Sequence, residues 1–192
     1  YNAIKDMEYH YKMLEAMGIT NIGNINIHIG GAYGDKSIAL RQFHQNIKKL
    51  PSEIKMIMTL ENDDKTYNVE ETLTTCEKEH IPMILDYHHY MANRGDITLS
   101  HYLQRIYDTW HRTNKNPKVH LSSPKSDQFY RAHADFVSFD FVLPFLEMAK
   151  LNDQDIDVII EAKQKNLAMH KLIEDIASLR GVKRISSSTV EW

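Results

Sequence analysis

The chain repeats one structural unit five times, and this repetition constrains its fold more than any other feature. Each unit holds a short apolar run, a polar loop and a stretch with helical spacing of apolar residues. The apolar runs are NINIHI, MIMTLE, IPMILD, PKVHLS and DVIIEAK. Mostly continuous apolar strands are typical of parallel sheets that helices cover. The pattern therefore predicts an α/β protein with parallel strands.

Helical spacing follows or precedes each run, and the spacing between runs indicates a barrel. The expected helices cover residues 2–17, 35–50, 69–79, 96–110, 138–150 and 163–179. Asn68 with Glu71 forms the pattern of a capping box, and Asp96 is the expected cap of the fourth helix. Successive strand ends lie 25 to 41 residues apart, near the average of about 31 residues per unit in a (β/α)₈ TIM barrel.

Five units cannot close an eight-stranded barrel. We therefore expect residues 1–192 to be a single domain, the C-terminal five β/α units of an incomplete TIM barrel. About three units would precede Tyr1, which is itself not a methionine. The alternative is a doubly wound open sheet, but Gly30, Gly31 and Gly34 do not match its GxGxxG fingerprint.

Composition excludes several classes of protein. Hydrophobic residues make up 42% and charged residues 26% of the chain, which is typical of a soluble globular domain. No signal peptide and no run of about 18 apolar residues is visible, so we expect a cytoplasmic protein without a membrane partner. The single cysteine, Cys76, excludes a disulfide framework, whereas eleven histidines favour imidazole ligands for any bound metal.

Each predicted strand ends in a residue able to ligate a metal. These residues are His28, Glu61, Asp86, His120 and Glu161. In a barrel the carboxyl ends of the strands surround one mouth, so two imidazoles and three carboxylates would meet there. Such an acidic cluster repels itself unless cations occupy it, and two or three divalent ions are the simplest remedy. A polar residue at a single strand end could merely cap a helix or face solvent, but five together argue for a site.

Other residues near the same mouth extend this site. His89 and His133 lie in loops above it and are candidates for a further metal position, whereas His88 is expected to be the non-ligating member of the histidine pair. Lys118 precedes His120 by two residues and shares its side of the strand. There it would neutralise Asp86 or Glu161 or be chemically modified into an anionic ligand, unless it precedes the strand and is solvated. Tyr87 and other loop aromatics could stack on a base, although ordinary loop packing is the more frequent role.

Six segments, in this order, closely resemble the UV-damage endonuclease family (UvdE/UvsE). They are IHIGGAYGDK, LENDDK, LDYHH, HLSSP, HADF and EAKQK. The family belongs to the endonuclease-IV-like barrel superfamily, and the resemblance covers essentially the whole chain. It implies a TIM barrel that holds Mn²⁺ and cuts double-stranded DNA on the 5′ side of pyrimidine dimers and 6-4 products, and at abasic sites.

The resemblance also implies roles for individual residues. His28 and Glu61 match a first metal position, and a second is matched by Glu61, Asp86, His120 and Glu161. His89 and His133 match a third, and Lys118 matches a strand lysine beside the metals. We expect Glu61, Lys118 and Glu161 to act in catalysis. The family's first strands should supply another histidine ligand, which this chain lacks, so its own activity stays open.

Two alternatives belong to other classes of protein. A sugar or sugar-phosphate isomerase or epimerase of the same superfamily also binds paired divalent ions at this mouth. The chain could instead be a metal- or DNA-binding fragment without turnover. An open five-stranded sheet would also expose parallel edges, which favours self-association.

Overall fold

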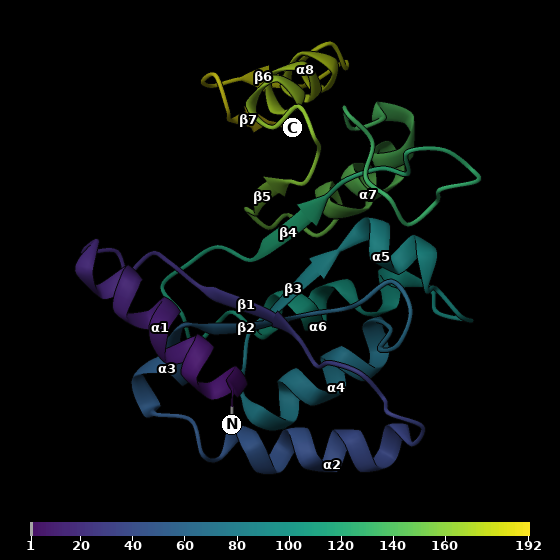
Figure 1. Ribbon diagram of the computed structural model, residues 1–192. Coiled ribbons are helices and arrows are strands. Elements are labelled where there is room, and N and C mark those ends of the chain that lie inside the picture. The colour runs from purple at the N-terminus through teal and green to yellow at the C-terminus, as the bar shows by residue number, and fades with distance from the viewer. Residues whose placement is uncertain (1) are drawn as a thin grey trace.

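Five parallel strands form the centre of the computed structural model, which describes residues 2–192 (Figure 1). All five strands are four residues long. Their bounds are β1 Ile25–His28, β2 Met58–Glu61, β3 Met83–Asp86, β4 Lys118–Leu121 and β5 Asp157–Ile160. The parallel α/β arrangement predicted from the sequence is confirmed.

Spatial strand order separates the two predicted architectures. The order in the sheet is β1-β2-β3-β4-β5, the same as the order along the chain. A doubly wound sheet reverses its order at a switch point, whereas a barrel adds each strand beside the previous one. Among the described residues the sheet holds these five strands and has two edges, β1 and β5, which agrees with the expectation of an incomplete barrel.

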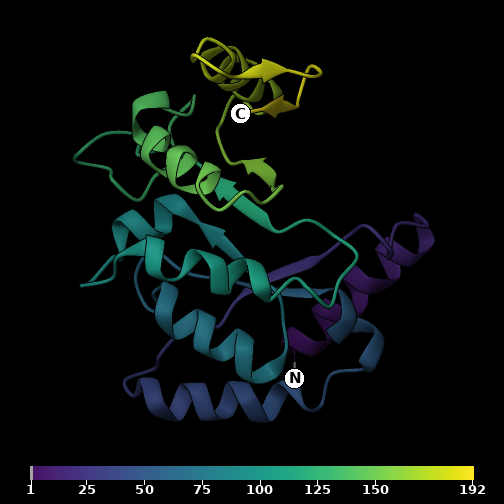
Figure 2. The ribbon, with the colours of Figure 1, turned by 180° about the vertical axis from the view of Figure 1, so that it is seen from behind.

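Helices connect and cover the strands, and α2 and α4 lie side by side in both views (Figures 1 and 2). The helices are α1 Asn2–Ala16, α2 Lys36–Ile47, α3 Ser52–Ile57, α4 Val69–Glu79, α5 Tyr87–Ala92, α6 Leu103–Asp108, α7 Phe139–Lys150 and α8 Asn166–Ala177. A 3₁₀ turn, η1 Leu99–His101, precedes α6, and a small hairpin of β6 Lys183–Arg184 and β7 Val190–Glu191 packs on α8. No described helix is long and apolar enough to cross a membrane.

Alternation along the strands gives the sheet two unlike faces. One face is apolar and fully buried, and on β2, β3 and β4 it carries Met58, Leu60, Met83, Leu85, Val119 and Leu121. Leu73 and Cys76 of α4 and Leu103 and Ile106 of α6 belong to the same buried core. Successive strand residues point to opposite faces, so Thr59, Glu61, Asp86 and His120 share the other face. The core thus holds the strands while their polar residues remain available to a site.

Local sequence signals explain most helix bounds, and the differences have physical reasons. The predicted helix 69–79 is confirmed as α4, and the Asn68–Glu71 capping box is present. The strand expected from Met56 begins only at Met58, because α3 starts directly after Pro51 and extends to Ile57. The single helix capped by Asp96 is wrong: Thr98 precedes the 3₁₀ turn η1, and α6 begins at Leu103.

Candidate metal centre

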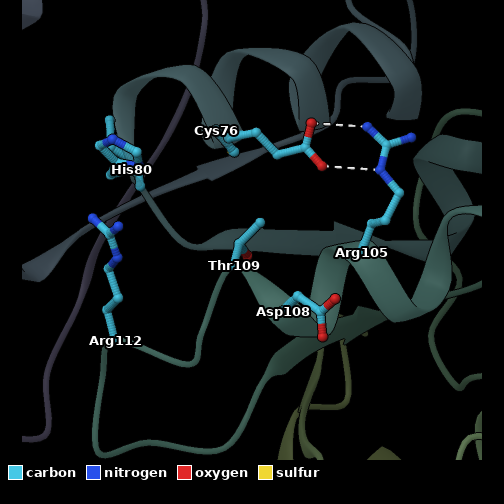
Figure 3. Close-up of a pocket in the computed structure, with 8 residues that line it drawn as sticks. Cys76, His80, Arg105, Asp108, Thr109 and Arg112 are labelled. Atoms are coloured by element: carbon cyan, nitrogen blue, oxygen red, sulfur yellow. Dashed lines mark hydrogen bonds and ion pairs between the residues drawn. The ribbon is translucent and has the colours of Figure 1, made fainter.

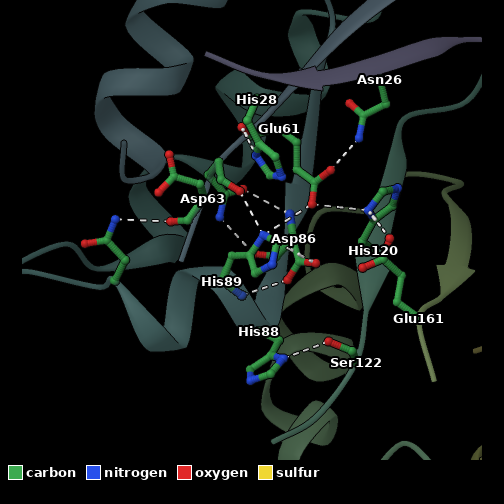
Figure 4. Close-up of polar contacts among 12 residues, drawn as sticks. Asn26, His28, Glu61, Asp63, Asp86, His88, His89, His120, Ser122 and Glu161 are labelled. Atoms are coloured by element: carbon green, nitrogen blue, oxygen red, sulfur yellow. Dashed lines mark hydrogen bonds and ion pairs between the residues drawn. The ribbon is translucent and has the colours of Figure 1, made fainter. Parts of the chain in front are cut away.

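Strand register brings the predicted strand-end residues onto one face. His28 of β1 pairs in register with Glu61 of β2, and Asp86 of β3 pairs with His120 of β4. Registered neighbours in a parallel sheet point to the same side. The side chains of these four residues therefore lie next to one another at the carboxyl ends of their strands (Figure 4).

The other two junctions are staggered by two residues. Glu61 pairs with Ile84, two residues before Asp86, and His120 pairs with Ile159, two residues before Glu161. A shift of two residues keeps each side chain on the same face of the sheet. At these two junctions the candidate ligand of the next strand lies two residues further towards the carboxyl end. Such a stagger accompanies the strand tilt of a barrel.

Glu61 lies at the middle of this arrangement. Its Oε1 is 3.3 Å from Nδ1 of His89 and 3.3 Å from Nδ1 of His120, and its Oε2 accepts a hydrogen bond from the amide of Asn26. His28 completes one group of possible metal ligands with Glu61 and His89, in which the ligand atoms lie within 4.8 Å of one another. Glu61 is the residue shared with the second such group.

The second group contains three carboxylates and one imidazole. Its members Glu61, Asp86, His120 and Glu161 also have ligand atoms within 4.8 Å of one another. Nδ1 of His120 lies 3.1 Å from Oε1 of Glu161. One buried atom of the group, Oδ2 of Asp86, makes no hydrogen bond. Because unpartnered buried polar atoms are rare and costly, this donor set fits a divalent cation.

The pKa values of the group reflect three carboxylates and two imidazoles crowded together. Burial alone would raise the pKa of Glu61, but hydrogen bonds from His120 and His89 outweigh it and lower this pKa strongly. Burial would lower the pKa values of both histidines, yet their carboxylate partners raise them to about 10 for His120 and about 9 for His89. Burial raises the pKa of Asp86 to about 7. Without metal, protons therefore supply the positive charge that this cluster requires.

The loop histidines lie in different surroundings. His89 lies in α5 and joins the cluster, and its ring is 6.3 Å from that of His133 between centroids. Nε2 of His133 is 4.0 Å from Oε2 of Glu161. His88 instead turns away from the cluster: it is fully buried and hydrogen-bonds to Ser122 and to the Tyr130 carbonyl.

Two amide side chains, those of Asn26 and Asn62, hold the ligands in place. Thr59 donates to Asn26, which donates to Glu61, so these two residues support the Glu61 carboxylate. Asn62 was not singled out by sequence reasoning. Its side chain accepts from the Asp86 N–H and donates to the Asp86 carbonyl, both at 3.0 Å. Its position directly after the strand-end Glu61 is the signal that could have identified it.

Lys118 begins β4 and is half-buried. It shares the face of His120, as strand alternation predicts, and pairs in register with Asp157. Within residues 2–192 no ion pair joins its ammonium group to Asp86 or Glu161. Its predicted catalytic role and the predicted metal ligands both stay predictions.

Of the two roles considered for the aromatic residues near the mouth, Tyr87 and Tyr90 have the favoured one, ordinary packing. Tyr87 is 4% and Tyr90 is 5% exposed, because both rings pack into the core, where Tyr87 contacts Phe141 and Phe145. Neither ring can therefore stack on a base. Short helix α5, which the sequence analysis treated as loop, causes this burial: Asp86 caps it and accepts from the His89 N–H at 2.7 Å.

Two cavities lie at opposite ends of the sheet. One of about 510 Å³ opens beside the candidate ligands and is lined by His133, Glu161, Ala162 and Lys163. Another, of about 220 Å³, lies between the C-terminal parts of α4 and α6 (Figure 3). There Arg105 donates two hydrogen bonds to Glu77. The first cavity, which borders the histidines and carboxylates, is the one that a substrate of this centre would enter.

A sequentially ordered parallel sheet with imidazole and carboxylate groups at its carboxyl edge defines a barrel-type protein with a candidate metal centre. The family described as UV-endonuclease UvdE matches residues 1–192, so the chain belongs to this family.

Individual relatives agree with this assignment. The chain is 53% identical to a UV DNA damage endonuclease of Bacillus cereus (strain G9842) and 56% identical to one of Bacillus thuringiensis subsp. konkukian (strain 97-27), each over 191 residues. Both alignments cover 100% of this chain and 60% of the relative, so the chain spans about three fifths of their length. The crystal structure of SacUVDE superposes with a TM-score of 0.77 at 28% identity, over 92% of this chain and 59% of that one.

Proposed function

We propose that the protein is a metal-dependent DNA repair endonuclease. It hydrolyses the phosphodiester bond 5′ to UV photoproducts, namely pyrimidine dimers and 6-4 products, and also acts at abasic sites. Residues 1–192 form one domain, the C-terminal part of its TIM barrel, and the protein acts in the cytoplasm. The observation that carries this proposal is the meeting of five strand-end residues on one face of the sheet, in a chain whose family is that of UV endonucleases.

Two or three Mn²⁺ ions are the proposed cofactor. The residues that would hold them are His28, Glu61, Asp86, His89, His120, His133 and Glu161. Mixed imidazole and carboxylate ligands suit Mn²⁺ better than Mg²⁺ or Ca²⁺, which prefer oxygen alone. When bound, such ions lower the pKa of water and neutralise charge that develops on a phosphate.

The chain's own groups contribute in different ways. Glu61, shared by both ligand groups, fixes their spacing, and Asn26 and Thr59 orient its carboxylate. Glu161 is the more exposed carboxylate and borders the larger cavity, so it is positioned to accept a proton from an attacking water. Lys118 adds a positive charge on the face that holds His120.

Double-stranded DNA with a UV lesion is the proposed partner. The formal net charge of −3 gives no general attraction to phosphates. Lys163, however, lines the cavity beside Glu161, and divalent ions would reverse the negative charge of the carboxylates there. Binding is therefore expected to depend on bound metal as well as on basic side chains.

Incision of a defined duplex tests the proposal. The substrate is an end-labelled duplex with one cyclobutane pyrimidine dimer, incubated with the protein and Mn²⁺, and the controls are an undamaged duplex and chelator. We expect a single cut on the 5′ side of the lesion that Glu61→Gln abolishes. Glu79→Gln is the matched control, because Glu79 pairs with His44 between α2 and α4, away from the site. Absence of cutting by protein with confirmed bound metal would refute the proposal.

A further inference from the structure

His88 is a completely buried histidine that contacts the metal centre only through other groups. It sits at the start of α5, beside the candidate ligand His89, and none of its side chain is exposed. Its Nε2 is 2.6 Å from the carbonyl oxygen of Tyr130, and its Nδ1 is 2.8 Å from Oγ of Ser122. Both partners belong to the segment that follows β4, so His88 joins two separate β/α units.

These contacts determine which atom carries the proton. A carbonyl oxygen only accepts, so Nε2–H of His88 donates to Tyr130. No carboxylate contacts the buried ring among the described residues, so the neutral ring accepts the Ser122 hydroxyl proton at Nδ1. The ring is thereby fixed in one tautomer and one orientation.

The segment held by His88 is the one that carries His133. After β4 the chain folds back on itself, because Lys125 N–H donates to the Ala132 carbonyl and Ala134 N–H donates to the Ser123 carbonyl. His133 lies in this fold-back opposite Pro124. His88 therefore hydrogen-bonds to this fold-back at two points: at Ser122, where it begins, and at Tyr130, near its turn.

Ring contacts complete the connection. The His88 centroid is 5.6 Å from that of His133 and 6.4 Å from that of His89, and Phe141 meets the His88 ring at 90°. Nε2 of His133 lies 4.0 Å from Oε2 of Glu161, which is a loose ion-pair contact. His88 is thus the buried group that sets the separation of His89 and His133, the two outer histidines of the centre.

We propose that His88 is a positioning residue that places His133 opposite His89 and so builds the outer metal position of the centre. This inference rests on the proposed metal function. It assigns a role to a histidine that is not itself a ligand. Outer partners that orient ligands typically change metal affinity by about 10- to 100-fold.

Substitutions separate the two hydrogen bonds. His88→Gln keeps an N–H donor that can reach the Tyr130 carbonyl, His88→Asn keeps an acceptor for Ser122, and His88→Leu removes both. His133→Ala removes the outer ligand directly. His44→Gln is the matched control, since His44 is another side-chain-bonded histidine, held by Glu79 away from the centre.

Binding is measured on the 192-residue chain by titration with Co²⁺, followed by visible absorption, and by counting Mn²⁺ retained after gel filtration. We expect His88→Leu and His88→Asn to weaken the last binding step about 10- to 100-fold, as His133→Ala does, and to leave the earlier steps unchanged. His88→Gln should restore much of it. The double variant His88→Leu/His133→Ala should lose no more than His133→Ala alone.

Other outcomes overturn the inference in distinguishable ways. If His133→Ala loses the last ion but the His88 variants bind like the parent chain, His88 has no positioning role and the centre stands. If His88→Leu weakens every step equally, the residue acts only on the fold. If the parent chain binds no metal at all, the proposed function fails as well.

Discussion

Asn62 shows how one side chain can extend a sheet beyond its last backbone hydrogen bond. Regular β2–β3 pairing stops at Glu61 and Ile84, and the Asn62 amide then bonds to both backbone groups of Asp86. The amide side chain therefore makes the hydrogen bonds that the backbone of one more paired residue would make, and it makes them at Asp86. Because Asn62 and Asp86 are both fully buried, water cannot replace these bonds.

We expect Asn62→Ala to destabilise the protein by about 2–4 kcal/mol. Each buried backbone group that is left without a hydrogen-bond partner costs about 1–3 kcal/mol. Asn93→Ala is the control: the Asn93 side chain donates to the Asp63 carbonyl, and its loss should cost about 1 kcal/mol. Urea denaturation measures both free energies of unfolding. Equal losses for the two variants would contradict the role given to Asn62.

The raised pKa values of His89 and His120 predict how metal binding depends on pH. With pKa values of about 9 and about 10, both imidazoles are protonated at pH 7 in the metal-free chain, whereas a metal ligand must be neutral. Asp86, with a pKa of about 7, is partly protonated at this pH as well. Mn²⁺ binding at pH 7 should therefore release about two to three protons, and affinity should rise as the pH increases towards 9.

Calorimetric titrations in two buffers of different ionisation enthalpy measure the released protons. Heat that is independent of the buffer would contradict the prediction.

The stability of the metal-free fold changes with pH in the direction opposite to metal affinity. Pairing of the two histidines stabilises the metal-free fold fully below about pH 6.5, and this contribution disappears as the pH rises through about 9 and 10.

Single residues were predictable where a topological rule applied to them. The five strand-end residues could be selected because parallel strands end at one edge, and the structure brings them within 4.8 Å in two overlapping groups. The hydrogen-bond partners of Asn62 and His88 could not be predicted, because the Asp86 backbone and the Tyr130 carbonyl lie 24 and 42 residues away. Long-range contacts of this kind leave no periodic signal.

At the scale of elements, the start of α4 offers a test of local stabilisation. The Asn68 side chain accepts a hydrogen bond from the Glu71 N–H, and the Glu71 carboxylate accepts one from the Asn68 N–H. We expect Asn68→Ala to lower the free energy of unfolding by about 1 kcal/mol, because the Glu71 N–H in the first turn loses its partner.

Asn46 provides the matched comparison for that cap. It is exposed in α2, and its side chain only accepts from Lys49. Asn46→Ala should change stability by less than about 0.5 kcal/mol. Thermal unfolding of the two variants side by side measures the difference, and indistinguishable midpoints would show that the cap contributes nothing.

Elements with a complete local signal were predicted well. Helix α4 has a cap, a periodic apolar face and a stop, and its bounds match the prediction. Helices α3 and α5 are six residues long, too short to show two turns of periodicity, and neither was predicted. The β6–β7 hairpin, with strands of two residues, has even less pattern to detect.

At the scale of the whole molecule, strand β5 leaves apolar surface uncovered. Val158 is 40% and Ile159 is 42% exposed, although strands β2 and β3 are completely buried. Uncovered parallel edges promote pairing with other chains. We expect the 192-residue chain to sediment faster than a 22.4 kDa monomer as its concentration rises.

A charge on β5 should reverse this association. Val158→Lys places a charge on the edge strand and is expected to shift the chain towards monomer in sedimentation velocity. Met56→Lys, at a 73% exposed position of α3, is the control and should leave the distribution unchanged. A parent chain that stays monomeric at all concentrations would disprove the prediction.

The two-residue offset between neighbouring strands has a consequence for how such a sequence can drift. Chain length between the ligand-bearing positions varies from 25 to 41 residues, so these side chains meet without a constant spacing along the chain. Deleting one residue inside a four-residue strand, by contrast, would rotate its chelating group into the hydrophobic layer. Parity, rather than distance along the polypeptide, is what natural selection has to preserve in this scaffold.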